Sequence, residues 1–146
     1  MADDFEVPTG YTTEQFVLEP LAARHNVAHH RAWTSSIEQI QATPGFAGRE
    51  WPRRPVSVGE NAFTLAAHAS HFSRRVGFTY AVLEPSSGEL IGCLYLYPSP
   101  DPDHDVEVRS WVSAAHADLD APLRATVREW LEAAWPFADP DYESAG

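Results

Sequence analysis

The sequence predicts one α/β domain built on a mixed (α+β) sheet, with its elements in the order β, α, α, β, β, β, α. Three observations predict this class. Two stretches of helical periodicity follow a short first strand, two strand segments flank a turn, and an alternating strand precedes a last amphipathic helix. The 146 residues, 44% of them apolar, are enough for one ordinary hydrophobic core.

The first part of the chain contains one strand and two helices. Residues 16–21 form the strand, and apolar residues at helical spacing over 22–41 predict the first helix. Ser57 and Glu60 fit a capping box, in which each side chain bonds the other residue's backbone N–H at a helix start. We expect the apolar set of this second helix to face the sheet: Ala62, Leu65, Ala66, Ala69, Phe72 and Val76.

The segment between these helices, residues 42–56, has three prolines, two glycines, three arginines and no periodicity. It is too long for a simple connector inside a compact domain, so we interpret it as a binding loop or lid.

The strands of the second part are predicted from their aromatic and β-branched content. Residues 78–83 and 90–97 flank a Pro/Gly turn and form a hairpin. Gly92 leaves space for a neighbouring backbone or a ligand. The next strand, 106–112, alternates: one face carries Val106, Val108 and Val112, and the other carries Glu107, Arg109 and Trp111.

A loop over 113–120 leads into the last helix, residues 121–135. Asp120 is the expected N-cap, and Pro136 ends the helix. Residues 137–142 can form at most one further short strand. Residues 1–15 are predicted to be a loosely ordered N-terminal arm, and residues 16–146 a single domain.

Composition narrows the classes of partner. All ten basic residues are arginine, against 21 acidic residues, so the net charge is -11. Such a chain repels nucleic acid and anionic membranes, and without lysine it has no Schiff-base chemistry and no P-loop lysine. The lone Cys93 cannot form an internal disulfide, and neither a long apolar run nor a basic leader occurs. We therefore expect a cytoplasmic protein with no nucleic-acid or membrane partner.

This order of elements resembles the GCN5-related N-acetyltransferase (GNAT) superfamily. The resemblance covers about residues 16–137 and is carried by the opening 16–21, the hairpin over 78–95 and the strand, loop and helix over 106–137. It implies a GNAT-like fold, shortened after the third main helix, and direct transfer of an acetyl group from acetyl-CoA to an amine.

The resemblance also implies where acetyl-CoA, or another acyl-CoA, binds. In the family the donor lies where the fourth strand diverges from the fifth, and its pyrophosphate rests on N–H groups that open the third helix, a general anion site. Residues 116–121, at that position, contain no glycine and two aspartates, so the loop departs from the family pattern. The residues that match the cofactor site are Val112, Ser113, His116, Asp118, Leu119, Asp120 and Ala121.

Two residues are candidates for the proton transfers that the resemblance implies. Glu107 is the candidate general base, and its alternative role is a surface ion pair with Arg109. Tyr142 is the candidate acid for the leaving thiolate. Tyr95 and Tyr97 are further candidates, and each tyrosine is alternatively a packing residue.

The substrate-binding candidates lie in the 42–56 segment and on the last strand. Arg49, Arg53 and Arg54 lie around Trp51 in a segment that, in the family, covers the acceptor. They would hold an acidic acceptor or a CoA phosphate, or alternatively they are solvated. Trp111 shares a face with Glu107 and either lines the acceptor pocket or packs in the core.

Two histidine pairs have helical spacing typical of metal ligands, His25 with His29 and His68 with His71. A metal site needs a third converging ligand, and we predict surface histidines and no metal.

Two classes of function stay open. The first is an acyl-CoA-dependent N-acetyltransferase that acts on a small-molecule or peptide amine. The alternative is a catalytically inactive GNAT-like binding or interaction module, favoured by the glycine-free loop and the short C-terminal part. An exposed sheet edge would need covering, so we expect a homodimer.

Overall fold

A computed structural model describes residues 3–142, and it contains one six-stranded sheet in the order β1-β2-β3-β4-β5-β6. Neighbouring strands are antiparallel except β5 and β6, which are parallel. The mixed sheet confirms the predicted fold class. The strands are β1 (Tyr11–Thr12), β2 (Val17–Pro20), β3 (Phe78–Leu83), β4 (Leu90–Tyr97), β5 (Val106–Val112) and β6 (Pro140–Tyr142).

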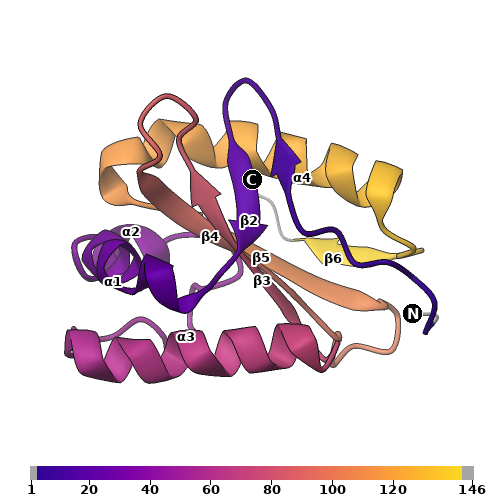
Figure 1. The fold of residues 1–146 in the computed structure, drawn as a ribbon, viewed down its shortest axis with the longest axis horizontal. Coiled ribbons are helices and arrows are strands. Elements are labelled where there is room, and N and C mark those ends of the chain that lie inside the picture. The colour runs from indigo at the N-terminus through magenta and orange to yellow at the C-terminus, as the bar shows by residue number, and fades with distance from the viewer. Residues whose placement is uncertain (1–2, 143–146) are drawn as a thin grey trace.

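Helices cover both faces of the sheet (Figure 1). One face packs against α4 (Asp120–Ala134), and the other against α1 (Asn26–Thr34), α2 (Ile37–Gln41) and α3 (Val58–Ser73). Two short 3-10 helices, η1 (Ala23–His25) and η2 (Ala114–Leu119), precede α1 and α4. The sheet therefore separates two hydrophobic cores.

The predicted hairpin and the alternating strand are confirmed at their predicted bounds. Val106, Val108 and Val112 lie in the core under α4, whereas Trp111 lies in the core under α1 and α3. A Cβ on Gly92 would lie 2.1 Å from the carbonyl oxygen of Trp111, so the space is taken by the neighbouring backbone.

The prediction of a single helix over 22–41 is wrong, because α1 ends at Thr34 and α2 begins at Ile37. Ser35 donates its hydroxyl to the carbonyl of Arg31, and Ser36 leaves the helical region with φ -132°. Serine side chains compete with helical hydrogen bonds in this way. The Ser36 hydroxyl instead accepts the N–H of Ala114 at 2.8 Å, which ties the break to η2.

The capping box at the start of α3 is confirmed: the hydroxyl of Ser57 accepts the N–H of Glu60 at 3.1 Å. The expected buried face of α3 is wrong in part, because Ala62, Ala66 and Val76 are exposed. Leu65 and Phe72 face inward as predicted, and Asn61 and His68 share this inward face. Asn61 and His68 are polar, but Asn61 bonds Trp33 of α1 and His68 bonds Thr79 of β3, which satisfies both side chains there.

The predicted start of the last helix is displaced. Residues 114–119 form η2 instead of a loop, and Asp120 is the first residue of α4, not its N-cap. Its carboxylate accepts a hydrogen bond from Nε of Arg124, 3.0 Å away and one turn further along α4.

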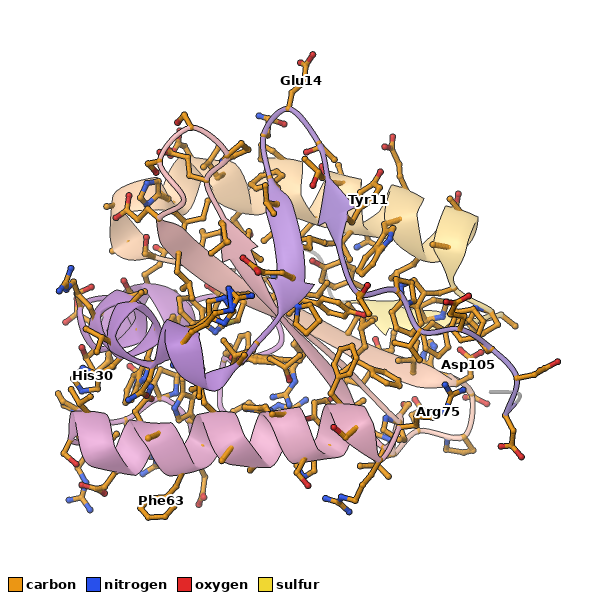
Figure 2. All side chains as sticks on the ribbon, viewed as in Figure 1. Tyr11, Glu14, His30, Phe63, Arg75 and Asp105 are labelled. Carbon is orange, nitrogen blue, oxygen red and sulfur yellow. The ribbon has the colours of Figure 1, made fainter. Side chains whose placement is uncertain are left out.

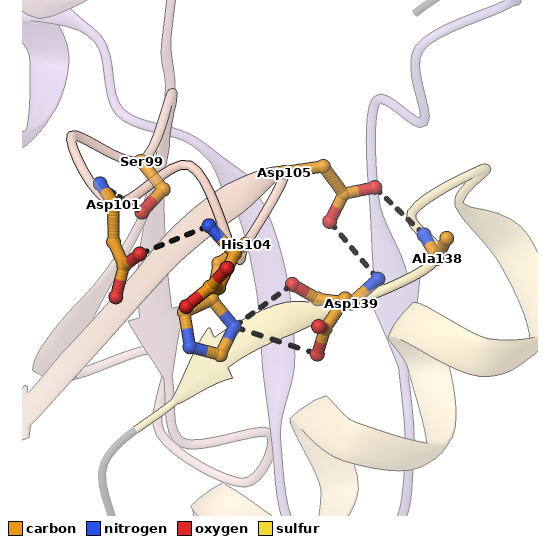
Figure 3. A network of polar contacts seen from close by, with 7 residues as sticks. Ser99, Asp101, His104, Asp105, Ala138 and Asp139 are labelled. Carbon is orange, nitrogen blue, oxygen red and sulfur yellow. Dashed lines mark hydrogen bonds and ion pairs between the residues drawn. The ribbon is translucent and has the colours of Figure 1, made fainter.

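A polar network fixes β6 beside β5 (Figure 3). The Asp105 carboxylate accepts the N–H groups of Ala138 at 2.7 Å and Asp139 at 3.1 Å. Nδ1 of His104 lies 3.3 Å from the Asp139 carbonyl oxygen and 3.4 Å from its carboxylate. The expected short strand after Pro136 is confirmed as β6.

The described part of the N-terminal segment lies along the sheet (Figure 2). Tyr11 pairs with Leu18 and stacks on Trp130, with 5.4 Å between ring centroids. The hydroxyl of Tyr80 donates to the carbonyl of Pro8, and Arg75 donates to that of Phe5 at 2.8 Å.

Candidate functional site

A pocket of about 420 Å³ lies between the sheet and the helix layer of α1 and α3. This volume is within the usual range for a site that holds a small molecule. Five parts of the chain line it: α1, the segment 42–56, α3, β4 and β5. The lining residues are His29, Trp33, Phe46, Trp51, Val56, Asn61, Thr64, His68, His71, Tyr95, Tyr97 and Arg109.

Aromatic rings form most of one wall. Trp51 is the centre of this group, with ring centroids 5.3 Å from Trp33, 5.8 Å from Phe46 and 6.2 Å from Trp111. The ring of Tyr95 lies 5.9 Å from Phe46. These tilted and edge-to-face contacts hold each other in place. The segment 42–56 thus supplies a wall of the pocket.

A buried polar network joins α1 to α3 beside these rings. The Asn61 amide oxygen accepts from Nε1 of Trp33 at 2.9 Å, and its nitrogen lies 3.0 Å from Nδ1 of His29. Burial lowers the pKa of His29 to about 4, with a smaller effect from His68. His29 is therefore neutral at pH 7.

A second network contains the hydroxyl of Tyr97 between two histidines of α3. Nδ1 of His68 and Nδ1 of His71 each lie 2.9 Å from this hydroxyl. The Thr79 hydroxyl is 3.0 Å from Nδ1 of His68. Burial, with a smaller effect from His71, lowers the pKa of His68 to about 4, so this ring is also neutral at pH 7.

Arg109 contributes a permanent positive charge to the pocket lining. Its guanidinium lies over the rings of Phe46 at 5.3 Å and Tyr95 at 5.9 Å, and its Nε is 3.3 Å from Oε1 of Glu107. Oε2 of Glu107 lies 3.4 Å from Arg49, so one carboxylate serves two arginines.

The histidine prediction is corrected by these contacts. His25 and His29 are buried rather than on the surface, and His68 and His71 line the pocket. The spacing of His68 from Leu65 and Phe72 places all three on one helix face, which is the signal that the sequence carried. In residues 3–142 no group of three or more His, Cys, Asp or Glu side chains is placed to hold a metal.

The parallel pair β5 and β6 is short. Its last paired residues are Val108 and Tyr142, so among the described residues no strand pairs with 109–112 on that edge. Tyr142 is buried, its hydroxyl lies 2.5 Å from that of Ser110, and its ring is 5.1 Å from the guanidinium carbon of Arg124. Burial raises the pKa of Tyr142 to about 12, so the phenol keeps its proton at neutral pH.

The residues after β5 do not fit a pyrophosphate. The N–H of Ala114 is bonded to Ser36, and that of His116 to the carbonyl of Ser113 at 2.9 Å. Oδ1 of Asp120 is buried and has no hydrogen-bond partner among residues 3–142, and this carboxylate in the first turn of α4 disfavours an anion there.

The other predicted cofactor residues do not form a cradle. Val112 lies in the core under α4, and Leu119 packs partly against that core. The Ser113 hydroxyl lies 2.8 Å from Nδ1 of His116. Asp118 and Ala121 are exposed.

Of the predicted substrate-binding residues, only Trp51 lines the pocket. Trp111 lies beneath it, fully buried, donating Nε1–H to the Tyr95 hydroxyl at 2.8 Å. Arg49 pairs with Glu107 in a small hollow beside Gly45, and Arg53 is exposed outside the pocket lining. His68 and Tyr97 join α3 to β4 in the pocket wall. Tyr97 was predicted only as a further candidate for the acid, and His68 only as a surface histidine.

No protein-family model and no curated protein matches the sequence. The fold is similar to solved acetyltransferases. The ribosomal-protein-S5-alanine acetyltransferase from Vibrio fischeri has a TM-score of 0.64 at 10% identity, over 86% of this chain and 69% of that one. RimL, a ribosomal L7/L12 alpha-N-protein acetyltransferase solved with coenzyme A, has a TM-score of 0.64 at 14% identity, over 88% and 69%.

The microcin C7 self-immunity acetyltransferase MccE, solved with acetyl-CoA and AMP, has a TM-score of 0.64 at 7% identity, over 88% of this chain and 71% of that one. The chain therefore has the fold of the GNAT acetyltransferases, which confirms the resemblance at the level of the fold.

Within residues 3–142, none of the helices is long and apolar enough to span a bilayer.

Proposed function

We propose that the chain is an N-acetyltransferase that transfers an acetyl group from acetyl-CoA, or another acyl-CoA, directly to a small-molecule or peptide amine in the aromatic pocket. One observation carries this proposal. Arg109 lines the pocket and follows Val108, which forms the last pair of β5 with β6 within residues 3–142. The pocket and the strand edge, where donors lie in this fold, thus meet at one residue.

Acyl transfer to an amine releases a proton, and we assign its acceptance to His68. Glu107, the base predicted from the sequence, is ion-paired with Arg49 and Arg109 and lies outside the pocket lining. We infer that Glu107 positions Arg109. His68 lies in the pocket wall, and its lowered pKa keeps it unprotonated at neutral pH.

The hydrogen bonds around Tyr97 give this proton a route. We assign the Nδ1–H tautomer to His68, so that it donates to the Tyr97 oxygen, and the Tyr97 hydroxyl donates to Nδ1 of His71. When Nε2 of His68 takes the proton of the amine, the Nδ1 proton passes to Tyr97, and the Tyr97 proton passes to His71. His71 is partly exposed and can release it to water.

Titration of the protein with acetyl-CoA and CoA, by calorimetry and by thermal shift, tests the proposal. A ligand at 100 times its Kd should stabilise the fold by about 2.7 kcal/mol. Mass spectrometry of an amine library should then detect products heavier by one acetyl group. Absence of binding at millimolar acetyl-CoA rejects the enzyme.

The alternative, an inactive GNAT-like binding module, is supported by the residues after β5. Ser36 occupies the Ala114 N–H, and Asp120 stands at the start of α4. Ligand binding in the pocket with no acetyl-CoA binding would favour this module. A homodimer remains part of the proposal, and light scattering tests it.

A further inference from the structure

We propose that the aromatic pocket binds a ligand of the size of an aromatic amino acid, whose ring packs against Trp51 and whose carboxylate pairs with Arg109. This inference rests on the proposed function, because it names the class of acceptor. It is carried by the chemistry of the pocket lining, which combines aromatic walls with one guanidinium.

The aromatic wall matches a flat ring better than a flexible chain. Trp51 contacts Trp33 and Phe46 at centroid distances of 5.3 and 5.8 Å, and Tyr95 and Tyr97 extend the lining along β4. Offset and edge-to-face contacts of this kind favour binding of a ring beyond the burial of its area. A cavity of about 420 Å³ holds one substituted ring with a short side chain.

The charge of the lining favours an anion over a cation. No Asp or Glu occurs among the pocket-lining residues, although the chain carries 21 of them. Burial lowers the pKa of His29 and His68 to about 4, so neither is charged at pH 7. The pocket therefore presents the Arg109 guanidinium without a carboxylate in its own wall.

The ion pair of Arg109 leaves its charge only partly balanced. Glu107 lies 3.3 Å from Arg109 and 3.4 Å from Arg49, so two guanidinium groups share this carboxylate, and Asp141 lines the same small hollow. When Arg109 pairs with a ligand carboxylate, Arg49 still balances Glu107. The side chain of Arg109 is 27% exposed, which leaves it accessible from the pocket.

An aromatic cage can also bind a cationic ligand, but here the guanidinium of Arg109 already occupies the cation position. Arg109 lies over the faces of Phe46 and Tyr95, so a ligand ammonium at these rings would meet the guanidinium. A polyamine or a lysine side chain would also bury its charge without a counter-ion, which is costly.

Calorimetric titration with four probes tests this class. L-Phenylalanine and 3-phenylpropionate carry ring and carboxylate, phenethylamine carries the ring without a carboxylate, and spermidine is a cation without a ring. We expect both carboxylates to bind, phenethylamine to bind at least about tenfold more weakly, and spermidine to give no heat. Equal or tighter binding of spermidine or phenethylamine overturns the inference, as does absence of binding by all ring probes.

Variants separate the two contacts. Arg109→Gln should weaken both carboxylates about tenfold and leave phenethylamine almost unchanged, whereas Trp51→Ala should weaken all three ring probes. Arg53→Gln is the matched control, because Arg53 is exposed in the same segment and outside the pocket lining. Should Arg109→Gln unfold, Thr64→Asp adds a carboxylate to the lining and should weaken 3-phenylpropionate while Tm is retained; unchanged affinity contradicts the inference.

Failure of the pocket assignment can be distinguished from failure of the proposed function. Binding of L-phenylalanine without any acetyl transfer rejects the enzyme and keeps the pocket assignment. Acetylation of spermidine, with no binding of the aromatic carboxylates, keeps the enzyme and rejects the pocket assignment.

Discussion

The hydroxyl groups of Ser110 and Tyr142 lie 2.5 Å apart, in a buried contact beside the pair of Val108 with Tyr142 that joins β5 to β6. The contact connects β5 with β6, the one parallel pair among the described strands. Tyr142→Phe removes it and leaves Ser110, which is 0% exposed, without this partner. We expect a loss of about 1–3 kcal/mol in the free energy of unfolding, measured by denaturant titration.

The double variant distinguishes a lost hydrogen bond from lost packing. In Ser110→Ala with Tyr142→Phe, both partners are apolar, so the double variant should be more stable than Tyr142→Phe alone. If both changes simply add, the contact has no special energetic role. Retained acetyl transfer in Tyr142→Phe would reject the prediction that Tyr142 is the general acid.

Gly92 is the position in the sheet that tolerates a side chain least. A Cβ there would lie 2.1 Å from the backbone oxygen of Trp111, and a backbone atom of a central strand cannot move away cheaply. Gly92→Ala should therefore lower stability by about 3 kcal/mol or abolish folding. Gly59→Ala, in the first turn of α3, is the matched control and should be neutral or slightly stabilising. Equal melting temperatures for both variants would contradict the register of β4 and β5.

The stability should fall as the pH is lowered from about 6.5 to 4. Burial lowers the pKa of His29 and His68 from 6.5 to about 4, so in this range the unfolded chain binds more protons than the folded protein. Stability therefore rises with pH through this window and is fully present above it, with a contribution on the order of 2–3 kcal/mol from each histidine.

Denaturant titrations of variants between pH 7.5 and 4 measure this effect. His29→Gln should flatten the curve relative to the parent protein. His104→Gln is the control, because Asp139 raises the pKa of this exposed histidine and its removal leaves the loss in place. A curve unchanged by His29→Gln would show that burial does not depress the pKa of His29.

The sheet was predictable because its signals are local. The alternation of Val106 and Val108 against Trp111 determines the two faces of β5 from the sequence alone, and the Pro/Gly turn determines the hairpin of β3 and β4. The break at Ser36 was not predictable, because it depends on a hydrogen bond to Ala114, 78 residues away.

The pocket could not be predicted from the sequence, because the spacing of residues along the chain does not reveal the contacts that form it. Asn61 and His29 are 32 residues apart, and His68 and Tyr97 are 29 apart. Polar residues on a helix are ordinarily assigned to the surface, but here they satisfy one another inside the helix layer. Glu107 was predicted as the base, with an ion pair to Arg109 as its alternative role, whereas its second pair with Arg49 required the fold of the segment 42–56.

Variants of His68 and Glu107 distinguish these two candidate bases. If His68 takes the proton, His68→Gln should lower kcat about 10²-fold or more, because it removes general base catalysis. Tyr97→Phe should lower kcat less, since it interrupts only the route to His71. Glu107→Gln should mainly raise KM for the acceptor, because Glu107 positions Arg109 and does not line the pocket. Steady-state kinetics with matched melting temperatures measure all three, and an inactive Glu107→Gln beside an active His68→Gln would return the role of base to Glu107.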